Sequence, residues 1–91
     1  MTKVLVVDDD TNICDLLKMY LEKEGYEVKT ANDGVEGMTV FKMYEPDIVL
    51  LDKNNAKFDV NYKYFISLGM KETKIDNELV AKRVVRLEIK N

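Results

Sequence analysis

Two unbroken apolar runs, each ending on aspartate, limit the possible folds of this chain more than any other feature. Residues 4–7 are aliphatic and precede three consecutive aspartates, and residues 48–51 are aliphatic and precede Asp52. A strand is continuously apolar when it is covered on both faces, as in a parallel sheet. The two runs therefore predict two central strands of a parallel β-sheet.

Between these runs, the apolar residues predict a helix, a strand and a second helix. Residues 26–31 form the predicted strand and residues 35–44 the second helix, with Pro46 beyond its end. The first helix has an amphipathic stripe of Ile13, Leu16, Leu17, Tyr20 and Leu21. Because such crossovers are right-handed, this order predicts an α/β fold, a parallel sheet with helices on its faces.

The 39 residues after Asp52 are compatible with two structures. Every even position from 58 to 68 is apolar, and this period of two favours a strand. Gly69 would suit the end of a helix, and a helical stripe is present as well. The stripe consists of Val60, Tyr64, Phe65 and Leu68. The pattern leaves helix and strand open for residues 58–68.

The end of the sequence predicts one more strand. Val85, Leu87 and Ile89 alternate with charged residues, as in a half-buried strand at the edge of a sheet. The tail is too short for a third helix and two further strand–helix units, because one unit takes about 22 residues in the first half. We expect residues 1–91 to form a single domain. Its residues 1–54 would be a βαβαβ half, and residues 55–91 a divergent tail completing or extending the sheet.

Charge and composition exclude several classes of function. With 14 basic and 17 acidic residues, the chain has no electrostatic reason to bind nucleic acid or anionic lipid. No apolar run approaches the ~20 residues that a membrane span requires, so we expect a cytoplasmic protein without a membrane partner. The single Cys14 excludes an internal disulfide, and the absence of histidine excludes imidazole and zinc-type chemistry. Carboxylates remain as the candidate functional groups.

Three aspartates are expected to meet at one edge of the sheet. Asp8 and Asp9 follow the first strand and Asp52 ends the third, and carboxyl ends of parallel strands lie at the same edge, where ligands bind. Clustered carboxylates repel one another unless a cation lies among them, and oxygen ligands suit Mg²⁺, Mn²⁺ or Ca²⁺. An aspartate could also act as a nucleophile towards phosphorus. For Asp10, in contrast, helix capping is the favoured explanation.

Four segments between residues 3 and 52 resemble the first half of a response-regulator receiver domain. They read Val-Leu-Val-Val-Asp-Asp-Asp, Leu-Glu-Lys-Glu-Gly-Tyr-Glu-Val, Ala-Asn-Asp-Gly-Val-Glu-Gly and Glu-Pro-Asp-Ile-Val-Leu-Leu-Asp. The resemblance implies a flavodoxin-like fold with strand order 2-1-3-4-5, and a histidine kinase or a small acyl phosphate as phosphodonor. It also implies that Asp52 is the phosphoacceptor. The implied Mg²⁺ ligands are Asp9 and Asp52 directly, Asp8 through water, and the backbone carbonyl of Asn54.

Beyond Asn54 the sequence departs from the family pattern. Residues 58–75 still resemble the family's third helix and fourth strand, which favours the helix, but no hydroxyl follows Ile75 where that strand would end. Lys90 is the candidate for the lysine that the family places beside its phosphoacceptor. We therefore expect a signalling domain, not an enzyme, with impaired Mg²⁺-dependent phosphorylation of Asp52. The alternatives are a non-signalling pseudo-receiver interaction module, or a chimeric or truncated protein for folding tests on a receiver scaffold.

The third strand also leads to an expectation about assembly. In the order 2-1-3-4-5 this strand is internal, so it needs a neighbour on each side. A tail that cannot supply a full fourth strand would leave an edge able to pair with another chain. We expect a homodimer that exchanges residues 58–91, with residues 53–57 as the hinge.

Overall fold

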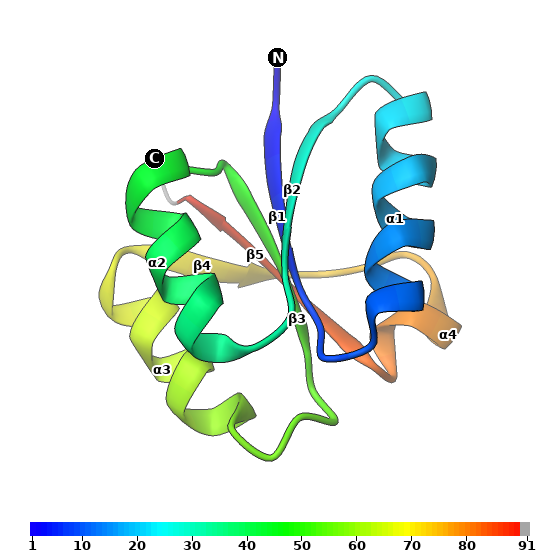
Figure 1. Ribbon diagram of the computed structural model, residues 1–91. Helices are drawn as coiled ribbons and strands as arrows, with labels where there is room; N and C mark the ends of the chain where they lie inside the picture. Colours follow the sequence, from blue (N-terminus) through cyan, green and yellow to red (C-terminus); the bar gives the residue numbers. More distant parts are fainter. Residues whose placement is uncertain (90–91) are drawn as a thin grey trace.

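The computed structural model of the protein describes residues 1–89 and contains a five-stranded sheet with the order β2-β1-β3-β5-β4. Helices α2 and α3 cover one face, and α1 covers the other (Figure 1). The class is α/β, as expected. The elements are β1 (Lys3–Val7), α1 (Thr11–Lys23), β2 (Glu27–Ala31), α2 (Gly34–Tyr44), β3 (Ile48–Asp52), α3 (Phe58–Ser67), β4 (Met70–Thr73), α4 (Glu78–Ala81) and β5 (Val84–Ile89).

The first half of the chain forms the predicted βαβαβ arrangement. Strand β1 lies between β2 and β3 and is parallel to both, and its residues 4–7 are all buried. Two core clusters lie on opposite faces of the sheet. On the α2 and α3 face the buried residues are Leu5, Val7, Ala31, Val49, Leu51, Phe65, Met70, Val85 and Leu87. On the α1 face they are Val4, Val6, Cys14, Val28 and Ile48.

Helix α1 begins at the predicted cap but buries less of its stripe than predicted. The Asp10 carboxylate accepts hydrogen bonds from the N–H groups of the first turn. Cys14 is buried, whereas Leu16 and Tyr20 of the predicted stripe are exposed. Leu17 and Leu21 pack partly against the core. A single helix over β1 and β2 leaves the flank of its apolar face in solvent.

Residues 58–68 settle as a helix followed by a turn, so the helical interpretation is confirmed. Phe65 is completely buried, with its ring centroid 5.2 Å from that of Phe41 on α2. The predicted stripe was partly wrong, because Val60 and Leu68 are 65% and 46% exposed. Gly69 adopts φ 94°, the left-handed conformation that ends many helices.

The second half differs from the predicted receiver topology at β5. This strand lies between β3 and β4 and is antiparallel to both. The expected order 2-1-3-4-5 and the edge position of the final strand were therefore wrong. Leu87 of β5 is opposite Val49 of β3 on one side and Glu72 of β4 on the other.

Chain length accounts for the reversal of β5. Only ten residues separate β4 from β5, and they include the four-residue helix α4. A parallel return would need a crossover of roughly a dozen residues or more, with a helix long enough to recross the sheet. An antiparallel return needs only a short connection at one edge.

The reversal also removes the argument from which a homodimer was expected. Every residue of β3 from Ile48 to Asp52 has a partner on β5, so β3 presents no unpaired edge within residues 1–89. Dimerisation stays a prediction without that support. No helix among these residues is sufficiently long and apolar to span a membrane.

Candidate functional site

The three predicted aspartates meet at the carboxyl edge of β1 and β3. Asp8 follows the last residue of β1, and Asp52 is the last residue of β3. One carboxylate oxygen from each of Asp8, Asp9 and Asp52 lies within 4.8 Å of the others. Parallel pairing of β1 with β3 produces this convergence, because it places Val7 opposite Leu51 and hence brings the next residues together.

Asp8 is the most deeply buried member of the cluster, only 1% exposed. Its Oδ1 accepts a hydrogen bond of 2.9 Å from the N–H of Asp10, while its buried Oδ2 has no hydrogen-bond partner. Burial raises the pKa of Asp8; the negative charge of Asp52 adds to this, and the Asp10 N–H and Arg83 oppose it. An unpartnered, buried carboxylate oxygen beside two other carboxylates fits a hard cation such as Mg²⁺.

Asp52 is held by the turn that follows β3. Its side chain is 3% exposed, and Oδ1 accepts a hydrogen bond of 2.9 Å from the N–H of Asn54. Asn54 is itself exposed, and its backbone N–H, two residues after the strand, fixes the orientation of the carboxylate. Lys53, between them, points its charge into solvent, since it is also exposed.

A cation that the sequence analysis missed completes the site. Nη2 of Arg83 lies 3.5 Å from Oδ1 of Asp8 and 3.9 Å from Oδ2 of Asp52. Arg83 reaches the acid cluster because β5 is antiparallel and begins opposite the end of β3, with Val84 paired to Asp52. The sequence does show that Arg83 directly precedes an apolar run. This position places Arg83 beside Asp52 only if the run forms a strand antiparallel to β3, and the sequence does not give that direction.

Comparison with known proteins identifies the family. Residues 4–57 match the model of the response regulator receiver domain. The chain belongs to this family. The receiver match ends in the loop after β3, and the topology departs from the expected order later in the chain, at β5.

Similar proteins agree with this assignment. The DNA-binding dual master transcriptional regulator RpaA of Synechocystis sp. is 39% identical over 59 residues, 65% of this chain and 24% of that protein. The probable transcriptional regulator ycf27 of Cyanophora paradoxa is 46% identical over 57 residues, 63% of this chain and 24% of that protein. The matched part of the receiver thus spans about a quarter of these curated relatives.

A solved structure of a chemotaxis protein supports the flavodoxin-like fold. Chemotaxis protein CheY4 of Vibrio cholerae is 31% identical, with a TM-score of 0.59 over 70% of this chain and 62% of that chain. The predicted flavodoxin-like class is confirmed for the portion shared with this structure.

The sequence analysis also considered a hydroxyl at the end of the fourth strand and a lysine beside Asp52. Strand β4 ends at Thr73, not at Ile75, and Thr73 is separated from β3 by β5. Among residues 1–89, β4 therefore brings no hydroxyl beside Asp52. Lys90 lies outside the described residues. The last described residue, Ile89, donates its N–H to the carbonyl of Asp47, at the opposite edge of the sheet from the acid cluster.

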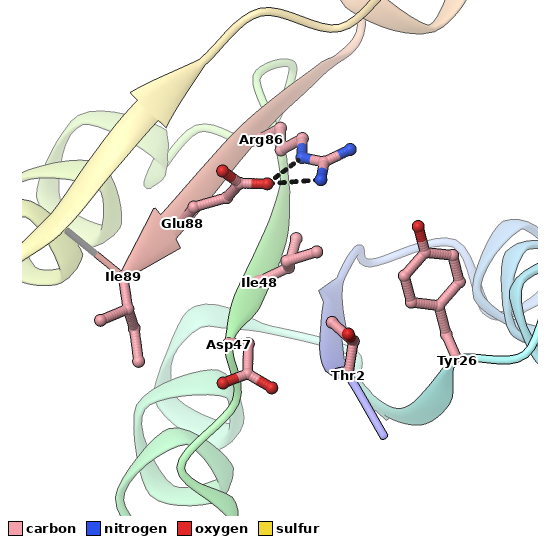
Figure 2. Close-up of a pocket in the computed structure, with 7 residues that line it drawn as sticks. All are labelled: Thr2, Tyr26, Asp47, Ile48, Arg86, Glu88 and Ile89. Atoms are coloured by element: carbon pink, nitrogen blue, oxygen red, sulfur yellow. Dashed lines mark hydrogen bonds and ion pairs between the residues drawn. The ribbon is translucent and has the colours of Figure 1, made fainter. Parts of the chain in front are cut away.

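A hollow of about 430 Å³ lies at that opposite edge (Figure 2). In Figure 2, the side chains of Arg86 and Glu88 on β5 turn towards each other and form an ion pair. The hollow is lined by Thr2, Tyr26, Asp47, Ile48, Arg86, Glu88 and Ile89. None of the three clustered aspartates lines this hollow, so the hollow and the acid cluster are separate features at opposite edges of the sheet.

Replacing Asp8 with asparagine should stabilise the metal-free protein at neutral pH. Burial raises the pKa of Asp8, so the folded state binds this proton more tightly than the unfolded state. The cost of charging Asp8 is therefore present above the raised pKa and disappears below its ordinary value. Asparagine removes the charge and keeps an oxygen for the Asp10 N–H.

Thermal melts in EDTA over a range of pH measure this effect. Asp8→Asn should melt at a higher temperature than the wild type at neutral pH, and the difference should shrink as the buffer becomes more acidic. Asp9→Asn, at an exposed carboxylate of the same cluster, is the control and should gain less. A lower midpoint for Asp8→Asn at neutral pH would contradict the prediction.

Proposed function

We propose that this receiver domain accepts a phosphoryl group on Asp52 in a Mg²⁺-dependent reaction, as a cytoplasmic signalling domain and not as an enzyme. The phosphodonor would be a histidine kinase or a small acyl phosphate. Membership of the receiver family supports a role in two-component signalling. The observation that carries the residue assignment is the convergence of three carboxylates around the unpartnered Oδ2 of Asp8.

The reaction transfers phosphorus from one nucleophile to another. A carboxylate oxygen of Asp52 forms a bond to phosphorus, while the bond from phosphorus to the donor's imidazole nitrogen or acyl oxygen breaks. The electron pair of the broken bond leaves with the imidazole, which takes up a proton, or with the acyl carboxylate. The Asn54 N–H holds the Asp52 carboxylate in place during the attack, because it donates to Oδ1.

The acidic residues supply the cation site. Asp8, Asp9 and Asp52, with the backbone carbonyl of Asn54, would hold Mg²⁺. A bound divalent ion neutralises the phosphoryl oxygens and lowers the repulsion between donor and carboxylates. Asp8 contributes a charged oxygen that the fold leaves without another partner.

Incubation with acetyl phosphate and Mg²⁺ tests the proposal. We expect the intact mass to increase by one phosphoryl group, more slowly than in a receiver that carries a hydroxyl beside its phosphoacceptor. Because β5 lies between β3 and β4, β4 cannot supply a hydroxyl donor next to Asp52. Loss of one preorganised donor commonly lowers the rate ~10²-fold.

The controls assign the label to its residue. Asp52→Asn and the addition of EDTA should each abolish labelling, whereas Asp59→Asn, an exposed carboxylate at the start of α3, should leave it unchanged. Labelling that persists in Asp52→Asn would overturn the proposal.

A second candidate is a pseudo-receiver that binds partners without phosphorylation. The observation that favours it is the reversed β5, because it separates β4, and with it Thr73, from the strand β3 that ends on Asp52. The two candidates differ in the labelling experiment, since a pseudo-receiver would take up no phosphoryl group at any Mg²⁺ concentration. Homodimerisation is a separate proposal for either candidate, and sedimentation or light scattering at micromolar concentration tests it.

A further inference from the structure

Arg83 bridges the two buried carboxylates of the acid site. Its Nη2 is 3.5 Å from Asp8 and 3.9 Å from Asp52, and its side chain is 39% exposed against 2% and 3% for the aspartates. Charge-assisted N–H···O bonds are usually about 2.7–2.9 Å long. Both contacts are longer, so the guanidinium neutralises the pair without a tight bond to either carboxylate.

The backbone fixes Arg83 at this place. Its carbonyl accepts a hydrogen bond of 2.6 Å from the N–H of Lys53, and its own N–H donates to the carbonyl of Val80 at 3.0 Å. The side-chain stem lines an apolar hollow between α1 and α4 together with Ile13 and Leu79. The position of the guanidinium therefore follows from the ladder between β3 and β5 and from packing of its stem.

The guanidinium retains unused hydrogen-bonding capacity. Nε of Arg83 is buried and has no partner, and arginine carries five N–H donors in a planar fork that matches phosphoryl oxygens. A phosphoryl group on Asp52 would place oxygens next to this fork, because Oδ2 of Asp52 is already 3.9 Å from Nη2.

We propose that Arg83 is the phosphoryl-binding cation of this site, and that before transfer it competes with Mg²⁺ for the carboxylate of Asp8. The inference rests on the proposed function and deepens it. Both cations neutralise the same pair of carboxylates, and two positive charges a few ångströms apart repel each other. Once phosphate adds negative charge, the site accommodates both.

This competition predicts opposite effects on two measurements. Removing the charge with Arg83→Gln should tighten Mg²⁺ binding by about two- to fivefold, the size expected for a partly exposed ion pair. The same variant should slow labelling by acetyl phosphate ~10²-fold, because a preorganised donor to the transferred group is lost. If Arg83 had a purely structural role, Arg83→Gln would lower both the Mg²⁺ affinity and the labelling rate, or would change neither.

The experiment measures the Mg²⁺ dissociation constant by calorimetry without phosphodonor, and the labelling rate by intact mass at saturating Mg²⁺. Arg83→Lys keeps the charge without the fork and should restore Mg²⁺ affinity to the wild-type value but labelling only in part. Arg86→Gln is the matched control, since Arg86 lies on β5, close in sequence to Arg83, and pairs with Glu88 at the other edge. It should change neither quantity.

Two outcomes overturn the inference, and they are distinct from failure of the proposed function. Equal labelling rates for wild type and Arg83→Gln, with labelling still lost in Asp52→Asn, would refute phosphoryl binding by Arg83. Weaker Mg²⁺ binding in Arg83→Gln would refute the competition, and this arm needs no phosphoryl transfer. A wild-type chain that takes up no label at all would refute the proposed function, and with it phosphoryl binding.

Discussion

Replacing Leu87 with aspartate should abolish cooperative folding of the protein. Leu87 is completely buried in the core cluster on the α2 and α3 face, and β5 has a strand on each side. The substitution removes a large apolar group at a cost of about 2–5 kcal/mol and places an unpaired carboxylate in the core. A domain of this size has a free energy of unfolding of only about 5–15 kcal/mol, so most of its stability would be lost.

Urea titration followed by far-UV circular dichroism measures the loss. The matched control is Lys71→Asp, which introduces the same side chain at an exposed position of the edge strand β4 and should retain a cooperative transition. A Leu87→Asp protein with an unfolding midpoint near that of the wild type would mean that β5 lies at an edge, as its alternating sequence suggested.

Replacing Phe65 with alanine should lower the free energy of unfolding by about 3–5 kcal/mol, the usual cost of deleting a fully buried aromatic ring. Phe65 has no exposed surface and joins α3 to α2 through its contact with Phe41. The cavity would open between the helix layer and the sheet, where neither helix can move inward without breaking other contacts.

Val60→Ala on the same helix is the control for Phe65→Ala. Because Val60 is 65% exposed, its truncation should change the free energy of unfolding by no more than about 0.5 kcal/mol. Similar losses for both variants in urea titrations would contradict the placement of Phe65 in the core.

The sequence predicts the first half of this fold well because its signals are redundant. Runs of aliphatic residues identify β1 and β3, and the cap at Asp10 together with helical spacing identifies α1. The tail carries weaker signals. Alternation in β5 reports which residues face the core, but it is the same in parallel and antiparallel strands. The direction of β5, and with it the strand order, depends on two other factors. One is the short length of chain between β4 and β5, and the other is the edge of β3 that would be unpaired without β5.

The same difference between the two halves of the chain applies to the acid site. Asp8, Asp9 and Asp52 could be predicted because each follows or ends a recognisable parallel strand, and the structure brings all three together. Arg83 could not, since its place beside Asp52 depends on the reversal of β5. Residues far apart in sequence meet at a predictable edge only when the strand directions are known.

The central position of β5 also has a consequence for the order in which the chain folds. It is the last of the five strands to be synthesised, yet it separates β3 from β4. Inserting it between two strands already in place would require them to be held apart with unpaired backbone groups. Strands β4 and β5 are joined by a short connection and pair antiparallel, so they can form first as a hairpin, within about 1–10 μs. The hairpin then docks on β3 as a unit, and a nascent chain that has not yet released β5 keeps β3 open to other polypeptides.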